Sequence, residues 1–282
     1  MSKILDGKAV SESVKEQVAL GVNELKKAGI SVGLAVILVG NNPASKIYVA
    51  NKKKACEATG IKSFEYILDE NTTQDELISL INTLNAEKSV NGILCQLPLP
   101  PHINEQAVIE AISPDKDVDA FHISNVGRIM VGNFDFLPCT PAGIIEILDY
   151  YNIKIEGKNC VVIGRSNIVG KPMAMLLMHR NGTVTVCHSK TKNLADITKN
   201  ADILISSVGK ANFVTADMVK EGCVVIDVGM NRSEGKLCGD VCFEEVAAKA
   251  EYITPVPGGV GPMTIAILMK NTLTAAKKQN GR

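Results

Sequence analysis

The stretch "CVVIGRSNIVGKPMAMLL", residues 160–177, predicts a strand, a glycine turn and a helix in that order. An apolar run ends at Gly164, and a helical apolar pattern begins after Gly170. In this context a glycine-rich loop binds the pyrophosphate of a dinucleotide, because backbone N–H groups at the start of a helix attract anions. The stretch therefore predicts a doubly wound α/β domain that binds a dinucleotide.

The loop departs from the usual G-x-G-x-x-G spacing. Ser166 stands where the second glycine is expected, and the next glycine is Gly170, which gives G-x-S-x-x-x-G. Because the loop is one residue longer, we expect the pyrophosphate to sit less tightly on the start of the helix. The Ser166 hydroxyl can donate a hydrogen bond to it, and Arg165 can supply a positive charge. The alternative is an ordinary turn of an α/β protein that binds no nucleotide.

The end of the next predicted strand, 183–187, indicates which cofactor is bound. NAD-binding domains place a carboxylate in this region to hold the ribose hydroxyl. This chain has Cys187, His188, Ser189 and Lys190 there instead. A basic, hydroxyl-rich strand end suits a 2′-phosphate, so the sequence favours NADP over NAD.

Strands and helices alternate on both sides of this stretch, which predicts parallel sheets. Before it, strands are expected at 32–40, 62–68 and 91–97, and helices at 10–29, 44–60, 73–86 and 104–112. An irregular stretch, 113–141, precedes a helix at 142–151. Further strands are expected at 159–164, 183–187, 202–207, 223–229 and 251–255, and further helices at 170–181, 193–199, 215–220 and from 263 onward.

We therefore predict two α/β domains with a break near residue 140, where Pro138 and Pro141 lie. Residues 1–139 form the first domain, and 140–263 form a Rossmann-like second domain. The last helix, about 264–282, packs back onto the first domain. Two connections between the domains imply a cleft between them.

Composition excludes several classes of protein. A hydrophobic content of 46% with 21% charged residues predicts a substantial core. Lys+Arg and Asp+Glu are equal at 30 each, which argues against a general nucleic-acid or membrane surface. The eight cysteines lack zinc-ligand spacing, which indicates free thiols, a reducing compartment and no metal site. A polar N-terminus and only short apolar runs predict a soluble, cytoplasmic protein.

A second candidate site lies in the predicted helix at 44–60. Tyr48 and Lys52 are four positions apart and share one face of that helix, whereas Lys53 and Lys54 point elsewhere. A Y-x-x-x-K pair also marks short-chain dehydrogenases, but there it follows the nucleotide loop, and here it precedes it. From this segment alone, a solvated surface helix is an equally good interpretation.

Three further segments favour a site. "GILCQLPLPPH" (92–102) ends a strand with Gln96, and its prolines favour a rigid pocket wall. "DKDVDAFH" (115–122) places Asp117 and Asp119 in an irregular segment, where polar side chains are often functional, although a solvated acidic loop is the alternative. "TPVPGGVGPMT" (254–264) allows close approach of the backbone to a flat ligand, or forms a rigid hinge.

Seven motifs occur in order: "YVANK" (48–52), "QLPLP" (96–100), "KDVDAFH" (116–122), "PCTPAG" (138–143), "GRSNIVGKP" (164–172), "CHSKT" (187–191) and "TPVPGGVGPMT" (254–264). Together they resemble the bifunctional methylenetetrahydrofolate dehydrogenase/cyclohydrolase family, in its short bacterial form, over about residues 1–278. The resemblance implies a homodimer with folate in the cleft and NADP on the second domain. It also implies NADP-dependent oxidation of 5,10-methylenetetrahydrofolate to 5,10-methenyltetrahydrofolate, followed by hydrolysis to 10-formyltetrahydrofolate.

The resemblance also implies roles at matched positions. Lys52 is the implied catalytic lysine, with Tyr48, Gln96 and Asp119 beside it in the catalytic site. The implied substrate site is lined by Tyr48, Gln96, Pro98, Asp119, Pro257, Gly258 and Gly259. The implied NADP site is lined by Thr140, Gly164, Arg165, Ser166, Gly170, Ser189 and Met230.

Two rival interpretations remain open from the sequence. One is a two-domain NADP-dependent dehydrogenase of a different small substrate, of the amino-acid or shikimate type, which has no use for Tyr48 and Lys52 with Asp119. The other is a non-enzymatic module that binds NADP or folate. Formate-dependent ligation is not expected, because the sequence has no G-x-x-x-x-G-K-[ST] phosphate loop.

Overall fold

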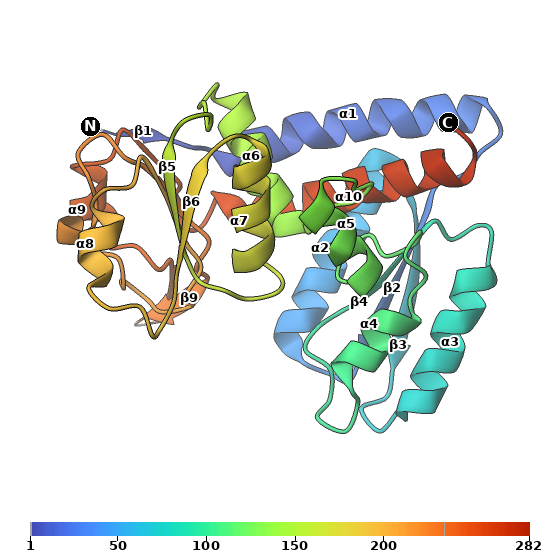
Figure 1. The fold of residues 1–282 in the computed structure, drawn as a ribbon. Helices are drawn as coiled ribbons and strands as arrows, with labels where there is room; N and C mark the ends of the chain where they lie inside the picture. The colour runs from blue at the N-terminus through green and yellow to red at the C-terminus, as the bar shows by residue number, and fades with distance from the viewer. Residues whose placement is uncertain (1, 234) are drawn as a thin grey trace. The chain divides into compact units, whose positions relative to one another are not determined.

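A computed structural model describes residues 2–233 and 235–282, and it divides the chain into two compact units. Unit 1 comprises the chain up to Ser11 together with Pro138–Thr264, and unit 2 comprises Glu12–Leu137 and Ile265–Arg282 (Figure 1). Helix α1 (Gly7–Lys27) and helix α10 (Val260–Gln279) each contribute residues to both units.

Unit 1 is built on a six-stranded sheet in the order β1-β11-β8-β7-β5-β6. Every neighbouring pair is parallel. Its strands are β1 (Lys3–Ile4), β5 (Asn159–Ile163), β6 (Thr183–Cys187), β7 (Ile203–Ser206), β8 (Val224–Asp227) and β11 (Tyr252–Ile253). The chain passes from β5 to β6 on one side and then to β7 on the other. Ligands bind at such a switch point, outside the carboxyl ends of the strands.

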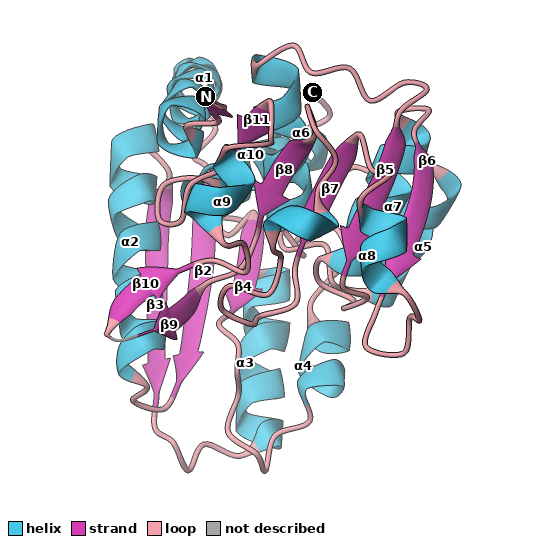
Figure 2. Cartoon of the chain, turned by 90° about the vertical axis from the view of Figure 1, so that its left-hand side faces the viewer, coloured by secondary structure: helices cyan, strands magenta, loops and turns pink. Residues whose placement is uncertain are grey.

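Short helices cover the sheet of unit 1, and Figure 2 shows α8 and α9 in front of it. The helices are α6 (Cys139–Tyr150), α7 (Gly170–His179), α8 (Leu194–Thr198), α9 (Phe243–Ala247) and the 3₁₀ turn η1 (Ala216–Met218). The central strands β7 and β8 are buried throughout, as expected for a parallel sheet covered on both faces. Where the sequence predicted a helix at 215–220, the structure has only the three-residue 3₁₀ turn η1.

Unit 2 contains a three-stranded parallel sheet in the order β3-β2-β4. Its strands are β2 (Gly33–Val39), β3 (Lys62–Leu68) and β4 (Gly92–Cys95), and its helices are α2 (Pro43–Thr59), α3 (Gln74–Ala86), α4 (Glu105–Ala111) and α5 (Ile123–Val131). All seven residues of the central strand β2 are buried, which matches its unbroken apolar sequence. β3 lies at the edge of the sheet.

Three features differ from the sequence prediction. Residues 1–11 belong to unit 1, not to the unit that follows them in sequence, because β1 pairs with β11. The stretch 113–141 is not wholly irregular, since it contains α5, which ends at the left-handed Gly132. A hairpin of β9 (Asn231–Ser233) and β10 (Lys236–Cys238) follows β8. These elements have two to nine residues, too few for a clear hydrophobic period.

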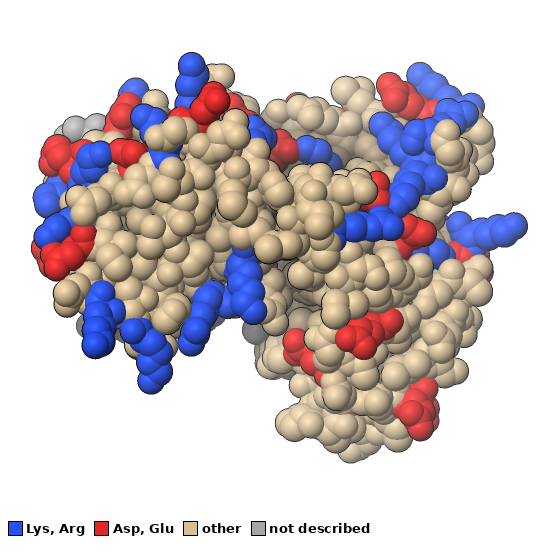
Figure 3. All heavy atoms as spheres, in the orientation of Figure 1, with Lys and Arg blue, Asp and Glu red and all other residues tan. Residues whose placement is uncertain are grey.

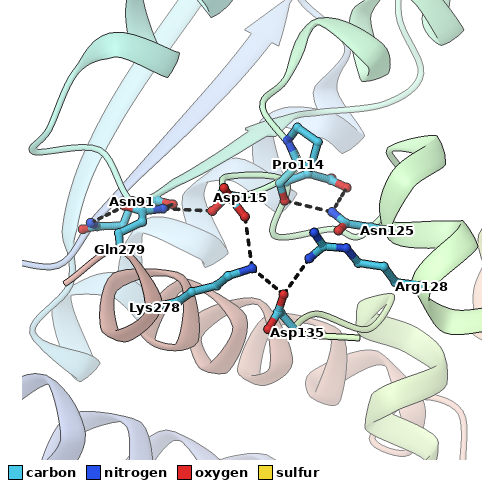
Figure 4. A network of polar contacts seen from close by, with 9 residues as sticks. Asn91, Pro114, Asp115, Asn125, Arg128, Asp135, Lys278 and Gln279 are labelled. Carbon is cyan, nitrogen blue, oxygen red and sulfur yellow. Dashed lines mark hydrogen bonds and ion pairs between the residues drawn. The ribbon is translucent and has the colours of Figure 1, made fainter. Parts of the chain in front are cut away.

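The end of α10 is held on unit 2 by a polar network (Figure 4). Lys278 pairs with Asp115 at 3.1 Å and also with Asp135, which accepts a further bond from Arg128 at 2.7 Å. The side chains of Asn91 and Gln279 share a hydrogen bond of 2.9 Å. These contacts fix the C-terminal helix against the segment that carries the KDVD sequence.

Candidate active site

Lys52 is joined by a hydrogen bond to the residue that follows β4. Its Nζ donates to Oε1 of Gln96 at 2.7 Å. The Gln96 Nε2 donates to the Leu97 carbonyl at 2.7 Å, and its backbone N–H donates to Ile37 at 2.8 Å. The amide oxygen of Gln96 is thereby turned toward the ammonium. Tyr48, one turn earlier on α2, is 39% exposed, whereas Lys52 is half-buried.

Asp119 lies near the same end of β4. The segment before it runs alongside this strand, with Ile93 paired to Asp117 in a parallel bridge. The pKa of the Cys95 thiol is raised to about 12, mainly by burial, with a smaller contribution from the charge of Asp119 and an opposing one from the charge of Lys52. Both charges therefore act on the last residue of β4. Lys52 is hydrogen-bonded to Gln96 at this strand end, and the pairing of Ile93 with Asp117 places Asp119 alongside the end of the same strand.

The residues around Asp119 explain its position. Lys116 is buried, and its Nζ donates to the carbonyls of Leu84 (3.0 Å) and Glu87 (2.7 Å) at the end of α3. Burial lowers the pKa of this ammonium. After Asp119, the chain turns through Ala120, which has a left-handed φ of 58°. Lys116 thus anchors the segment at one end, and Ala120 redirects it at the other.

Unlike the half-buried Asp119, Asp117 is buried, and its hydrogen bonds within the protein indicate a structural role. It is 2% exposed and accepts hydrogen bonds from the His122 N–H at 2.8 Å and the Asn125 side chain at 2.9 Å. Burial raises the pKa of its carboxyl. From α10, Asn271 donates to the Val118 carbonyl at 2.8 Å. The sequence did not single out Lys116 or Asn271, because their partners are backbone carbonyls distant in the chain.

The whole of the glycine- and proline-rich segment 254–264 belongs to unit 1, whereas the rest of α10, from Ile265 on, belongs to unit 2. Gly258 accepts a hydrogen bond from the Lys8 N–H at 3.1 Å, and a Cβ on Gly7 would lie 1.8 Å from the Gly259 carbonyl oxygen. Pro257 is exposed. The implied substrate residues therefore fall in two groups: Pro257, Gly258 and Gly259 in unit 1, and Tyr48, Gln96, Pro98 and Asp119 in unit 2.

The glycine turn after β5 leaves no room for a side chain at Gly164 or at Gly170. Gly164 has a φ of +130°, and a Cβ there would lie 2.3 Å from Oγ of Ser207. A Cβ on Gly170 would lie 2.3 Å from the Gly164 carbonyl oxygen. Ser166 Oγ accepts from the N–H groups of Val169 (3.2 Å) and Gly170 (3.3 Å), which leaves its own hydrogen for donation. The turn therefore allows a ligand to approach the backbone closely at the start of α7.

The other implied cofactor residues lie on three further segments of unit 1. In the loop after β6, the His188 N–H donates to Thr191 Oγ1 at 2.9 Å, and Ser189 is exposed. Thr140 is half-buried in the first turn of α6, and Met230 is 52% exposed after β8. Figure 3 shows Lys and Arg side chains projecting from the lower edge of unit 1. Such charges favour an anionic ligand.

Other kinds of site are not found in the described chain. Within residues 2–233 and 235–282, no group of three or more His, Cys, Asp or Glu side chains is placed to hold a metal ion. The eight cysteines are free thiols. No helix formed by the described residues combines the length and apolarity needed to cross a membrane.

A glycine turn without room for a Cβ, at the switch point of a parallel sheet, is typical of dinucleotide-binding domains, and here a second α/β unit carries a hydrogen-bonded lysine, as in two-domain enzymes of this class. The chain belongs to the tetrahydrofolate dehydrogenase/cyclohydrolase family: residues 5–119 match its catalytic domain and residues 138–280 match its NAD(P)-binding domain. The predicted α/β fold, with a Rossmann-like nucleotide-binding domain, is confirmed.

Curated relatives and solved structures support this assignment over the full length. The bifunctional protein FolD of Acetivibrio thermocellus is 61% identical over 279 residues, which cover 99% of this chain and 98% of that protein. The crystal structure of the bifunctional FolD enzyme from Campylobacter jejuni has 55% identity and a TM-score of 0.97, covering 99% and 100% of the two chains. The Trypanosoma brucei enzyme, solved with NADP and an inhibitor, has 39% identity and a TM-score of 0.95, covering 100% and 99%.

The shikimate-type alternative receives no such support. Shikimate 5-dehydrogenase from Thermus thermophilus is 16% identical, with a TM-score of 0.54. A likeness at this level shows a shared fold alone. The folate interpretation is therefore favoured over the rival one.

Proposed function

We propose that this chain oxidises 5,10-methylenetetrahydrofolate to 5,10-methenyltetrahydrofolate with NADP and then hydrolyses the product to 10-formyltetrahydrofolate. Full-length membership of the family supports both activities. The single structural observation that carries the proposal is the 2.7 Å hydrogen bond from Lys52 to Gln96 at the end of β4.

The oxidation needs alignment more than it needs a base. Loss of hydride from the methylene bridge leaves a cation that two nitrogens already share, and NADP accepts the hydride when it is bound. We assign its binding to the N-terminus of α7 and the adjoining loops. Its contacts are Thr140, Gly164, Arg165, Ser166, Gly170, Ser189 and Met230. The absence of space for a Cβ at Gly164 and Gly170 supports a close backbone approach to a phosphate.

The hydrolysis does need proton transfer. Water must lose a proton as it attacks the one-carbon unit, and the departing ring nitrogen must gain one. We assign both transfers to Lys52, because a cationic substrate nearby favours the neutral amine of a lysine. Gln96 orients this amine through a neutral oxygen, whereas a carboxylate at that position would hold it as an ammonium.

Two further side chains suit the folate itself. The exposed ring of Tyr48 offers a flat face to an aromatic ring of the substrate. The pterin edge carries adjacent N–H donors, which match the two oxygens of Asp119. Pro98, Pro257, Gly258 and Gly259 are assigned to the walls of the substrate site.

The proposal is tested by following NADPH absorbance after the purified chain is mixed with 5,10-methylenetetrahydrofolate and NADP. We expect NADPH to form, and a second assay on 5,10-methenyltetrahydrofolate to show hydrolysis above the uncatalysed rate. No NADPH under these conditions would favour a non-enzymatic binding module. NADPH without accelerated hydrolysis would leave a monofunctional dehydrogenase.

Asp119→Ala is expected to weaken folate binding roughly tenfold to a hundredfold, because a carboxylate that accepts two hydrogen bonds is lost. The dissociation constant of tetrahydrofolate, measured by calorimetry, checks this. Asp115→Ala is the matched control, since Asp115 lies in the same segment but pairs with Lys278. Unchanged folate affinity in Asp119→Ala, or an equal loss in both variants, would refute the assignment.

Arg165→Ala is expected to raise the KM for NADP roughly tenfold and the KM for NAD by clearly less, since both cofactors carry the pyrophosphate but only NADP has a 2′-phosphate for the guanidinium. Steady-state kinetics with the two cofactors measures this. Arg180→Ala provides the control, because Arg180 lies in the same unit but pairs with Asp149. Equal losses for NADP and NAD would remove the 2′-phosphate role from Arg165.

The assembly and compartment are also part of the proposal. We assign a homodimer in a reducing, cytoplasmic compartment. The exposed edge strand β3, with Ile67 61% exposed, supports association with a second copy, because an edge strand offers unpaired backbone groups. Light scattering over a concentration series should give twice the mass of the chain, and a monomer at all concentrations would contradict the dimer.

A further inference from the structure

Asp240 is a fully buried carboxylate that receives hydrogen bonds from two separate loops. It is 0% exposed and lies just after the β9–β10 hairpin. Its donors are the N–H groups of Val208 (2.7 Å), Gly209 (3.2 Å) and Lys210 (3.0 Å), the Ser206 hydroxyl (3.2 Å) and the Asn231 side chain (2.9 Å). A buried charge with this many donors rigidifies the segments that supply them.

A second buried carboxylate holds Asp240 in place. Asp227, the last residue of β8, is 3% exposed and accepts from the N–H groups of Asp240, Val241 and Gly229, each at 2.9 Å. Burial raises the pKa of the Asp227 carboxyl to about 6, so at neutral pH it is still mainly ionised and accepts these bonds.

Neighbouring glycines show how closely this pair of carboxylates is enclosed. A Cβ on Gly229 would lie 2.2 Å from Oδ1 of Asp240, and a Cβ on Gly239 would lie 1.8 Å from Oδ2 of Asp227. No side chain fits at either position. The backbone is therefore fitted to the two carboxylates, and the arrangement of the loops depends on them.

The segments held by Asp240 lie at the carboxyl ends of the strands, as the glycine turn after β5 does. Ser206 and Asp227 are paired at the carboxyl ends of β7 and β8. Ser207 begins the first loop, and its Oγ donates to the Ile163 carbonyl at 3.1 Å, directly before Gly164. Ser207 is also the residue that a Cβ on Gly164 would strike. Asp240 therefore holds the loop whose first residue, Ser207, packs against the glycine turn.

We propose that Asp240 is a positioning residue for NADP: it holds the loop 207–210 and the segment 228–231, which leads into β9, in the arrangement that the cofactor requires, without touching the cofactor. The proposal rests on the assignment of NADP to unit 1. It extends that assignment to a carboxylate with no place among the implied cofactor residues. Because five donors surround its charge, Asp240 is compatible with an anionic ligand nearby.

Asp240→Asn tests the proposal. The amide keeps the shape of the side chain but has one acceptor oxygen, so its nitrogen must face N–H donors on one side. We expect the dissociation constant of NADPH, measured by the fluorescence of the bound dihydronicotinamide, and the KM for NADP to rise at least roughly tenfold. Hydrolysis of 5,10-methenyltetrahydrofolate, assayed without NADP, should stay within about twofold of wild type, because it does not use these loops.

A matched control separates positioning from general destabilisation. Asp202 directly precedes β7, at the amino ends of the strands, whereas Asp240 lies at their carboxyl ends. Asp202 also accepts a hydrogen bond from a backbone N–H, that of Asn159 at 2.9 Å, and it pairs with Lys220 at 2.6 Å. Asp202→Asn should leave NADPH affinity unchanged. If Asp240→Asn is insoluble, Asn231→Ala removes a single donor to Asp240 and should raise the NADPH dissociation constant roughly threefold to tenfold.

Unchanged NADPH affinity in Asp240→Asn, or in Asn231→Ala where that variant replaces it, would overturn the proposal. So would an equal loss of affinity in Asp202→Asn, or a loss of hydrolysis in step with NADPH binding. Failure of the wild-type chain to bind NADPH at all would contradict the proposed function first, and the positioning role with it.

Discussion

Lys52→Met is expected to lower the rate of 5,10-methenyltetrahydrofolate hydrolysis by roughly a hundredfold to ten-thousandfold, the usual contribution of a positioned general acid–base. Methionine has nearly the length of lysine but cannot transfer a proton or donate to Gln96, whose oxygen receives the Lys52 Nζ at 2.7 Å. Loss of methenyl absorbance measures the rate, and thermal unfolding followed by circular dichroism checks that the chain is folded.

The neighbouring lysine supplies the control for this substitution. Lys53, on the same helix, points to a different partner, Glu65 at 2.9 Å, and is largely exposed. Lys53→Met should leave hydrolysis within about twofold of wild type, since a surface ion pair contributes little. Full hydrolysis in Lys52→Met, or an equal loss in Lys53→Met, would remove Lys52 from the mechanism.

Gly164→Ala is expected to weaken NADP binding roughly a hundredfold or more, because two independent effects oppose the new methyl group. The φ of +130° is strained for alanine, and its Cβ would lie 2.3 Å from Oγ and 2.6 Å from the carbonyl oxygen of Ser207. The turn or the loop after β7 must move, and both belong to the proposed cofactor site. NADPH fluorescence titration measures the change.

The contribution of backbone strain alone is given by Gly157→Ala. Gly157 has a φ of +70°, but a Cβ there would have nothing within 4 Å. This variant should lose about 1 kcal/mol of stability and keep its NADPH affinity. If Gly164→Ala binds NADPH as tightly as Gly157→Ala does, the glycine turn is not the cofactor contact that we propose.

Much of the fold was predictable because buried parallel strands have unmistakable sequences. The apolar runs at 32–40 and 159–164 correspond to β2 and β5, whose side chains have no polar face to show. The N-terminal strand was not predictable. β1 has two residues, both exposed, and its pairing with β11 depends on a contact between distant parts of the chain.

The candidate site could be predicted where its residues lie on one element. Helical spacing alone places Tyr48 and Lys52 on one face of α2. The different environments of Asp117 and Asp119 were not predictable, because the pairing of Ile93 with Asp117 decides which carboxylate is buried. Asp240 was missed for the same reason, since its donors at 208–210 lie on a different loop. Local patterns identify elements, whereas registers decide which polar side chains meet.

The most direct test of the central claim, that Lys52 hydrolyses the product of an NADP-dependent oxidation on the same chain, is one time course. Wild type and Lys52→Met are each mixed with 5,10-methylenetetrahydrofolate and NADP, and NADPH, the methenyl form and the 10-formyl form are quantified together. We predict NADPH and 10-formyltetrahydrofolate from wild type, and NADPH with accumulating methenyl form from the variant. Formation of 10-formyltetrahydrofolate by the variant at the wild-type rate would contradict the claim.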